Sequence, residues 1–254
     1  MVPYRNRSNN GPSWQYDIIW NQPDYKGCVA CGANRIGKSQ LGAFVTAMMV
    51  TGEHPTYKSP EQGRAWIVGL DSKAIGSVLQ PYFESLIPKR YKDKGKWHGK
   101  LGYWSLKSDG RDWEVWFKSV DSGRQKFQGD QIDFAWVDEE PLKDGVFREL
   151  ELRTLDRAAI WLMTATPVEG TKWLKDTLDR EDVYYTMAGM RENPYIPLSE
   201  IEKLCRSMPE DERQVRIEGI YIIFGGRPVF NRKLLEELEN SAMPHVDGIL
   251  ALAG

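Results

Sequence analysis

The chain has 254 residues, of which 41% are hydrophobic and 28% charged, and its formal net charge is −2. This length allows one large domain or a domain with a small appendage, and the composition excludes a disordered or fibrous protein. No run approaches the roughly 18 apolar residues of a membrane span, and the polar N-terminus lacks a signal-peptide core, so we expect a cytoplasmic protein with no membrane partner.

Short apolar runs alternate with helical patterns from residue 27 to residue 165, which is typical of a parallel sheet flanked by helices. The sequence therefore predicts an α/β fold. In chain order we expect a strand over 27–31, a helix over 38–50, a strand over 65–70, a helix over 72–87 capped by Asp71, a strand over 132–137, a helix over 142–155 and a strand over 160–165.

Two segments depart from this alternation. Residues 104–106 and 113–120, separated by the turn-forming Ser108-Asp109-Gly110, predict an antiparallel hairpin added to the core. A strand over 183–187 follows, and then a helix that starts at Pro197, with Ser199 and Glu202 at capping-box spacing. We expect residues 1–192 to form the core and residues 193–254 a small, partly helical linker subdomain.

Cys28 and Cys31 have the CxxC spacing of some metal and redox sites. Both lie on a predicted strand, where residues three apart point to opposite faces, and no second cysteine pair completes a zinc site. We therefore expect buried structural thiols.

Residues 32–39 read GANRIGKS and match the phosphate-loop pattern GxxxxGK[ST], with a strand before and a helix after. Backbone N–H groups of such a loop bind phosphate oxygens, helped by the positive end of the helix. Lys38 is predicted to reach the β- and γ-phosphates of ATP and Ser39 to ligate Mg²⁺. The predicted nucleotide-binding residues of the loop are Gly32, Ala33, Asn34, Arg35, Ile36, Gly37, Lys38 and Ser39.

Arg35 is an unusual cation inside such a loop. Its guanidinium either contacts the γ-phosphate from within the same subunit, as a catalytic group, or points outward to a surface carboxylate.

The apolar strand over 132–137 ends in Asp138, Glu139 and Glu140. Parallel strands deliver their carboxyl ends to the ligand crevice, so Asp138 is predicted to hold Mg²⁺ beside Ser39. Glu139 is predicted to be the base that orients the attacking water, and Glu140 is the alternative for that role.

A third strand ends in Thr164-Ala165-Thr166-Pro167. The hydroxyls of Thr164 and Thr166 either bind the γ-phosphate or its water, or only satisfy the turn before the proline.

Together these motifs resemble the ATPase domain of the large terminase subunit of tailed double-stranded DNA bacteriophages. The resemblance rests on GANRIGKS with its internal arginine, on DSGRQKFQG leading into IDFAWVDEEP, on TATP, and on two later segments, 216–221 and 226–230. It covers roughly residues 12–230 and implies the additional-strand, conserved-glutamate (RecA-like) class of P-loop fold.

The resemblance also implies function and partners. It implies ATP-driven translocation of double-stranded DNA into a procapsid by a homo-oligomeric ring, with a monomer as the alternative state of the isolated chain. The implied partners are the portal protein and the small terminase subunit, in the cytoplasm of an infected bacterial host. Gln15 matches the glutamine that reads the adenine edge. Arg124 is the candidate for an arginine that acts on the neighbouring subunit, with Arg148 and Arg153 as rivals.

The family normally carries a C-terminal nuclease, whereas only about 24 residues follow Phe230 here, without a cluster of acids. We therefore expect an ATPase half with no nuclease activity. The alternatives are a superfamily 2-like helicase or another nucleic-acid-stimulated ATPase, and a phosphate-binding scaffold without turnover.

Residues 89–126 contain eleven basic and five acidic residues, although the whole chain is slightly acidic. The lysine-rich segment 89–100 and the following Trp-rich hairpin either contact DNA phosphates or form a solvated loop beside a packed hairpin. The tryptophans in question are Trp97, Trp104, Trp113 and Trp116.

Overall fold

The computed structural model describes residues 13–141, 144–168 and 170–220. Its helices and strands are α1 (Trp14–Asn21), β1 (Gly27–Gly32), α2 (Lys38–Thr51), β2 (Gln62–Gly69), α3 (Ser72–Ala74), the π-helical turn η2 (Ile75–Leu79), α4 (Gln80–Leu86), α5 (Lys89–Asp93), β3 (Lys96–His98), β4 (Tyr103–Ser108), β5 (Arg111–Ser119), the short 3₁₀ turn η4 (Arg124–Phe127), β6 (Phe134–Asp138), α6 (Asp144–Leu155), β7 (Ile160–Ala165), α7 (Lys172–Leu178), β8 (Val183–Ala188), α8 (Leu198–Ser207) and α9 (Glu210–Arg216).

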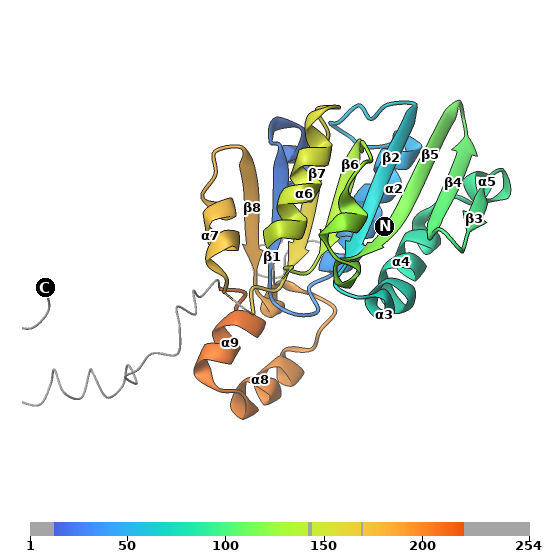
Figure 1. Ribbon diagram of the computed structural model, residues 1–254. Coiled ribbons are helices and arrows are strands. Elements are labelled where there is room, and N and C mark those ends of the chain that lie inside the picture. The colour runs from blue at the N-terminus through green and yellow to red at the C-terminus, as the bar shows by residue number, and fades with distance from the viewer. Residues whose placement is uncertain (1–12, 142–143, 169, 221–254) are drawn as a thin grey trace, which may run out of the picture. The chain divides into compact units, whose positions relative to one another are not determined.

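Within the described residues, eight strands form one sheet in the order β3-β4-β5-β2-β6-β7-β1-β8, which can be followed across Figure 1. The six strands from β5 to β8 in this order are parallel, and β3 and β4 pair antiparallel at one edge. Strand β7 lies between β1 and β6, so one additional strand separates the strand before the phosphate loop from the strand that ends in carboxylates. The predicted α/β fold of the additional-strand class is confirmed.

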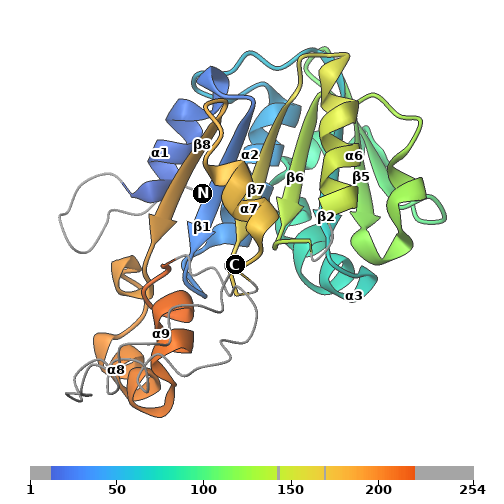
Figure 2. The same ribbon diagram turned by 60° about the vertical axis from the view of Figure 1, so that its left-hand side comes forward.

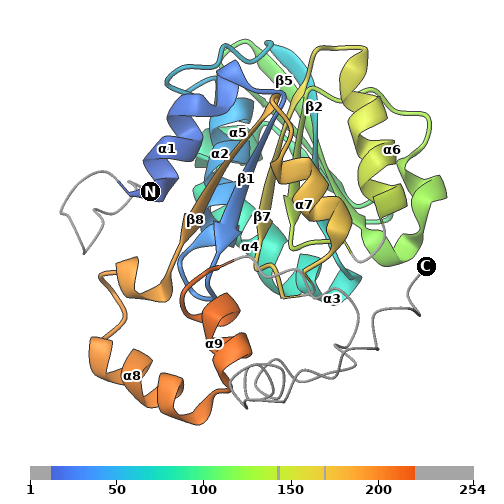
Figure 3. The same ribbon diagram turned by 90° about the vertical axis from the view of Figure 1, so that its left-hand side faces the viewer.

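Helices cover both faces of the sheet, as the edge-on view in Figure 3 shows. On one face Ile18 of α1, Val45 of α2 and Phe83 of α4 belong to a single buried cluster. On the other face Phe147 of α6 and Leu174 of α7 belong to a second cluster. The two apolar layers fix the sheet rigidly between helices, which is what positions the ends of its strands.

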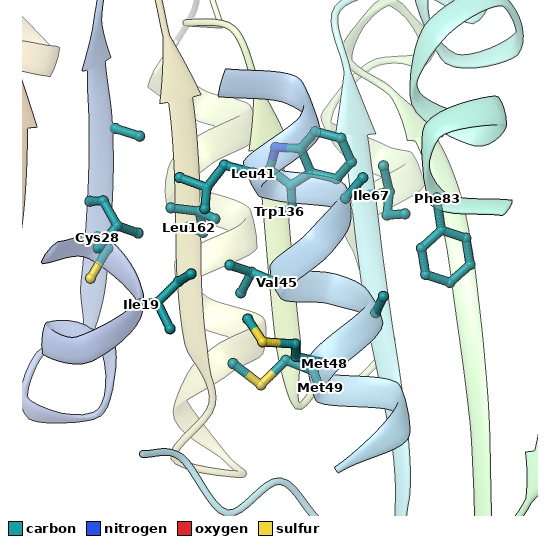
Figure 4. Close-up of a cluster of buried hydrophobic side chains, with 14 of the residues drawn as sticks. Ile19, Cys28, Leu41, Val45, Met48, Met49, Ile67, Phe83, Trp136 and Leu162 are labelled. Atoms are coloured by element: carbon teal, nitrogen blue, oxygen red, sulfur yellow. The ribbon is translucent and has the colours of Figure 1, made fainter. Parts of the chain in front are cut away.

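Helix α2 provides much of the first cluster. In Figure 4 the side chains of Val45, Met48 and Met49 extend from α2 into the cluster that also contains Leu162 of β7. An apolar helix that follows a phosphate loop directly is thereby held against the central strands, and its first residues are fixed beside their carboxyl ends.

The two cysteines of β1 are both fully buried, Cys28 in the first cluster and Cys31 in the second. They thus lie on opposite faces of the sheet, as the strand geometry predicted. Burial raises the pKa of each thiol to about 12, which keeps both protonated and unreactive at neutral pH.

The predicted hairpin is present as β4 and β5, joined by a two-residue turn in which Asp109 and Gly110 both have positive φ, 53° and 78°. Such a turn matches the twist of the strands, and Ser108 belongs to β4 rather than to the turn. β5 also pairs in parallel with β2, which makes the hairpin part of the main sheet. Strand β3, in the lysine-rich segment, is an addition that the sequence did not predict.

The tryptophans of this region pack within the sheet. Trp113 is fully buried, Trp97 lies 5.7 Å from Trp104, and Trp116 stacks on Tyr103 at 4.2 Å between ring centroids. Packing in the hairpin therefore accounts for these side chains, and DNA contact is not needed to explain them.

The predicted helix over 72–87 is interrupted. Asp71 caps its start by accepting from the N–H of Ala74, as expected, but η2 is a π-helical turn between α3 and α4. Pro81 lies two residues after η2, in the first turn of α4, and lacks an N–H group, so the regular hydrogen-bond pattern cannot continue through it.

Beyond β8 the chain forms α8 and α9 at the edge where the parallel strands end, which Figure 2 shows clearly. Pro197 is the cap residue and α8 begins one residue later than predicted, so Ser199 lies inside the helix and forms no capping box. The contacts within the chain divide it into residues 1–223 and 224–254. The expected boundary at residue 192 thus falls inside the first unit, because Ile201, Val215 and Ile217 are buried there. The segment 226–230 lies outside the described residues.

Candidate nucleotide and catalytic site

The phosphate loop connects β1 to α2, and its backbone is tightly turned. Arg35 and Gly37 have positive φ, 60° and 89°, and Gly37 is the residue before the first turn of α2. The N–H groups of Ala33 and Asn34 donate to the carbonyls of Ala188 (2.9 Å) and Arg216 (3.0 Å). These two amides are therefore bonded within the chain, and which amides of the loop bind phosphate stays a prediction.

A cavity of about 830 Å³ opens over the loop. Helix α1, the loop, the helical segment 72–86, the end of β6 and the segment after β8 all contribute to its wall. Its lining residues are Gln15, Asn34, Arg35, Ile36, Gly37, Lys38, Ser39, Gln40, Val78, Tyr82, Glu139, Asn193 and Tyr195. Most of the predicted nucleotide-binding residues of the loop therefore share one cavity with Gln15 and Glu139.

Lys38 is 6% exposed, and its Nζ donates to the carbonyls of Gly32 (3.1 Å) and Ala33 (2.7 Å). Burial lowers the pKa of this ammonium, and the carboxylates of Glu139 and Asp138 oppose the shift. The carbonyl oxygens of Gly32 and Ala33 thus hold the ammonium group of Lys38 at the phosphate loop. A cation in this position would stabilise bound phosphate groups.

Ser39 and Asp138 are brought together although they are 99 residues apart: Oγ of Ser39 donates to Oδ2 of Asp138 at 3.1 Å. Burial raises the pKa of the Asp138 carboxyl to about 6; Glu139 adds to the shift, and hydrogen bonds from Thr164 and Ser39 oppose it. A hydroxyl and a carboxylate this close fit the two protein ligands that a phosphate-bound Mg²⁺ takes. Among the described residues, no three His, Cys, Asp or Glu side chains gather as a separate metal site.

Thr164 lies behind Asp138 and does not line the cavity. It is fully buried, its Oγ1 accepts from the indole N–H of Trp136 at 2.8 Å, and it donates to Oδ1 of Asp138 at 2.7 Å. The prediction that Thr164 contacts the nucleotide therefore does not hold. Its hydroxyl instead fixes the orientation of the carboxylate that faces Ser39.

Glu139 follows β6 in a left-handed conformation, with φ 66°. Its N–H donates to the carbonyl of Thr164 at 2.7 Å, and its Oε2 accepts from the N–H of Thr166 at 2.8 Å. The turn separates Glu139 from Asp138, so one carboxylate faces Ser39 and the other lines the cavity.

Glu140, the alternative base, is 4% exposed and does not line the cavity. It contacts the hydroxyl of Thr171, the residue that caps the start of α7. Its position supports a structural role, joining the end of β6 to α7.

Gln15 is nearly buried in α1, and its Nε2 lies 3.5 Å from the carbonyl of Gly37. Arg35 is exposed at the cavity, and its carbonyl accepts from Nδ2 of Asn193 at 2.8 Å. Both predicted residues thus border the cavity, and the roles assigned to them remain predictions.

Five residues of the cavity wall were not predicted, among them Tyr82, Asn193 and Tyr195; the other two are Gln40 and Val78. The Asn193-Pro194 pair indicates a turn in the sequence, but nothing there indicates that the turn folds back onto the phosphate loop. Only the tertiary fold brings these side chains to the site.

Arg124 lies away from this cavity. Its side chain is 60% exposed, and its Nε donates to the buried carboxylate of Glu149 at 3.0 Å. It lines a different cavity of about 850 Å³ together with Arg148 and Leu152. Arg153 also binds Glu149. Within one chain, the predicted catalytic arginine is therefore separate from Lys38 and Glu139.

The sequence pattern that defines the family "Terminase large subunit, T4likevirus-type, N-terminal" matches residues 29–182. The large terminase subunit of Salmonella phage P22 is 26% identical over 258 residues, which cover 85% of this chain and 51% of that protein. The chain thus spans about half the length of this curated relative.

Solved structures share the fold at lower identity. The ATPase domain of the Thermus phage P74-26 large terminase has a TM-score of 0.64 at 15% identity, covering 83% of this chain and 93% of that one. A large terminase of a thermophilic bacteriophage, solved in complex with ADP, has a TM-score of 0.68 at 17% identity, covering 83% of this chain and 53% of that one. The phage HK97 large terminase has a TM-score of 0.62 at 12% identity, covering 92% and 56%. By its sequence match over most of the core, and with a fold that agrees, the chain belongs to the large terminase family, in its N-terminal region.

Proposed function

We propose that this chain is the ATP-hydrolysing part of a DNA-packaging motor. The observation that carries the proposal is the meeting, around one cavity, of a phosphate loop, the hydrogen-bonded pair Ser39–Asp138 and the carboxylate of Glu139. Because the sequence matches the large terminase family, we no longer favour the alternative of a superfamily 2-like helicase. The nucleotide complex of the thermophilic phage relative supports nucleotide as the ligand of this cavity.

The roles follow from position. Lys38 and the loop amides bind the phosphates, Gln15 reads the adenine edge, and Arg35 neutralises γ-phosphate charge. Ser39 and Asp138 hold Mg²⁺, which supplies charge neutralisation at the phosphates. Glu139 accepts a proton from the attacking water and orients it. Thr164 and Thr166 position the two carboxylates.

In the assembled motor the chain acts on double-stranded DNA. Its partners are then further copies of itself in a ring, the portal protein of the procapsid and the small terminase subunit, in the cytoplasm of the infected host. Within the described residues no helix is long and apolar enough to span a bilayer.

The assignment of the base is tested with Lys38→Ala, Glu139→Gln and Glu140→Gln. We expect Lys38→Ala to lose nucleotide affinity, and Glu139→Gln to bind ATP but to lose turnover by roughly 10²-fold or more. Glu140→Gln should keep turnover and lower thermal stability, because Glu140 is buried against Thr171. Nucleotide titration, phosphate release and thermal unfolding measure the three effects. Normal turnover by Glu139→Gln would reject the assignment.

Metal dependence and nuclease activity are checked on the same protein. Removal of Mg²⁺ with a chelator should abolish phosphate release, and added Mg²⁺ should restore it. Incubation with plasmid DNA and Mg²⁺ or Mn²⁺ should leave the DNA intact, because we expect no nuclease activity from this chain. Cleavage that survives further purification would contradict that expectation.

A further inference from the structure

Lys118 of β5 carries an ammonium group that is enclosed by aromatic rings. Its Nζ lies 4.0 Å from the ring centre of Trp66, 5.6 Å from that of Phe127 and 5.9 Å from that of Trp116. At these distances a cation is attracted to the face of an aromatic ring. The Lys118 side chain is 12% exposed, so little water weakens the attraction.

Two of the three rings belong to the sheet, and the third belongs to the segment that follows β5. Trp66 lies on β2 and Trp116 on β5, whereas Phe127 is the last residue of η4. The rings of Trp66 and Phe127 are both fully buried and lie 5.6 Å apart. Nζ of Lys118 also donates to the carbonyl of Lys126 in η4 at 2.7 Å. The ammonium group thus joins η4 to the sheet through one ring and one carbonyl of η4.

A buried ammonium group requires compensation, because the transfer of a charge out of water is unfavourable. Burial lowers the pKa of Lys118, and the charge of Asp130, whose Oδ2 lies 3.5 Å from Nζ, opposes the shift. Asp130 is itself bound by Arg64 at 3.0 Å. An apolar side chain could fill the same space but could not hold a carbonyl group. What the charge adds is therefore a fixed position for η4.

The segment around η4 begins and ends at glycines in the left-handed region. Gly123 and Gly129 have φ of 81° and 93°, and a Cβ at either would meet no atom within 4 Å. Glycine has access to many other conformations, so the chain can change direction at both positions. Between these glycines only Phe127 is buried. The contacts of Lys118 with η4 therefore restrain the whole segment.

Arg124 is the first residue of this restrained turn, two residues before the carbonyl that Lys118 holds. We propose that Lys118 is a positioning residue for Arg124: by holding the backbone of η4 against Trp66, it sets where the guanidinium group can reach. The inference rests on the proposed ATPase function and on the predicted role of Arg124. It adds to them a residue that does not line the nucleotide cavity.

The test compares Lys118→Met and Lys118→Arg in ATP turnover and ATP binding by the full chain, under conditions where rings assemble. Methionine keeps the length and the apolar contacts but has no charge and no N–H, whereas arginine can bind both an aromatic ring and a carbonyl. Lys107→Met is the matched control, because Lys107 is exposed on β4 and pairs with Asp112 at the other end of β5. Hydrogen exchange over residues 123–129 reports on the segment itself.

We expect Lys118→Met to lower kcat about 10²-fold, since a displacement of roughly 1 Å in a catalytic group has an effect of this size. The Kd for ATP should stay within about threefold, because binding belongs to Lys38 and the phosphate loop. Combined with Arg124→Ala, Lys118→Met should cause no further loss, because both changes remove one function. Exchange over residues 123–129 should become faster in Lys118→Met. Lys118→Arg should keep most of kcat, and Lys107→Met all of it.

The proposal is overturned by unchanged turnover or unchanged exchange in Lys118→Met, by losses that multiply in the double variant, or by a loss of ATP affinity that accounts for the lost turnover. Normal turnover by Arg124→Ala would also overturn it, because Lys118 would then have no catalytic group to position. If Lys118→Met does not fold, as judged by thermal unfolding, Phe127→Leu tests the same contact from the side of η4, with the same expected results. A wild-type chain without turnover would instead reject the ATPase function, and exchange over residues 123–129 would still decide whether Lys118 holds η4.

Discussion

At the scale of single residues, Glu139 shows how backbone conformation can determine which of several neighbouring carboxylates faces a cavity. A left-handed conformation is unfavourable for a residue with a side chain, and such positions gather at functional sites. Here the turn with φ 66° directs Glu139 into the cavity, whereas its neighbours Asp138 and Glu140 face Ser39 and Thr171. Three consecutive carboxylates therefore serve three purposes.

A second residue, His54, gives the protein a predictable response to pH. It is 7% exposed just beyond α2, and its Nδ1 accepts from the N–H of Tyr57 at 2.9 Å, with the Tyr57 ring edge-on at 6.2 Å. Burial lowers its pKa from 6.5 to about 4. As the pH falls from 6.5 to 4, His54 becomes protonated in the unfolded chain but stays neutral in the folded chain. The free energy of unfolding therefore decreases in this pH window.

His54→Asn keeps an acceptor for Tyr57 but cannot be protonated. Between pH 6.5 and 4, its free energy of unfolding should fall less steeply than that of the wild type, by up to about 1.4 kcal/mol per pH unit. Urea unfolding at several pH values measures both slopes. Parallel curves would show that His54 is protonated in the folded state.

At the scale of elements, α2 and β6 approach closely because Gly42 has no side chain. A Cβ at Gly42 would lie 2.0 Å from the Trp136 ring, whose N–H holds Thr164 and, through it, Asp138. Gly42→Ala should therefore destabilise the protein by about 1–3 kcal/mol and also lower turnover.

The matched control is Gly76→Ala in η2, where an added Cβ meets nothing within 4 Å. This change should leave turnover intact and leave stability equal or slightly higher. Denaturant unfolding and phosphate release on both variants make the comparison. Equal effects of the two substitutions would mean that the contact of Gly42 with Trp136 does not matter.

The elements that the sequence could predict are those whose signal is local. The strands over 27–31 and 160–165, the helix after GKS and the Asp109-Gly110 turn carry their own periodicity or turn chemistry. Strand β3 and helix α5 are short, rich in lysine and stabilised by their neighbours, so no local pattern marks them. The same reason applies in the site: Lys38 and Ser39 are set by a motif, whereas Asn193 and Tyr195 arrive only through the fold.

At the scale of the whole molecule, the separation of Arg124 from the nucleotide cavity agrees with a role toward a neighbouring subunit. Arg124→Ala should bind ATP normally but hydrolyse it poorly, since such an arginine contributes on the order of 10³-fold or more in phosphoryl transfer. Mixing Arg124→Ala with Glu139→Gln should restore part of the activity where rings assemble. No restoration would indicate action within one subunit and favour Arg35, and Arg148→Ala serves as the rival control.

The lysine-rich segment gives a prediction about DNA. Lys92 donates to the carbonyl of Glu84 in α4 at 2.8 Å, so its ammonium group is already engaged within the chain and we leave it out of the proposed DNA contacts. Lys94, Lys96 and Lys100 are exposed. Their triple replacement by Ala should weaken duplex binding and flatten its dependence on salt by up to about three contacts.

The control for this experiment replaces Lys172, Lys175 and Lys203 of α7 and α8, which pair with acidic residues three or four positions away. Lys172 and Lys203 are exposed, and Lys175 is half-buried. Binding titrations at several salt concentrations distinguish the two sets. An equal change of slope in both would show that net charge alone is being measured.

The hydrogen bonds from the amides of Ala33 and Asn34 to the carbonyls of Ala188 and Arg216 also limit how far the chain can be truncated at its C-terminal end. A fragment that ends at residue 192 keeps the phosphate loop, the carboxylates after β6 and the segment 164–167. It nevertheless removes the carbonyl that the Asn34 amide binds and the buried side chains of Val215 and Ile217. The phosphate loop of such a fragment would exchange its amide hydrogens faster and be open to proteases. We therefore expect the smallest unit that retains a native loop to extend to Ile217, beyond the last residue of the motif that ends in Pro167.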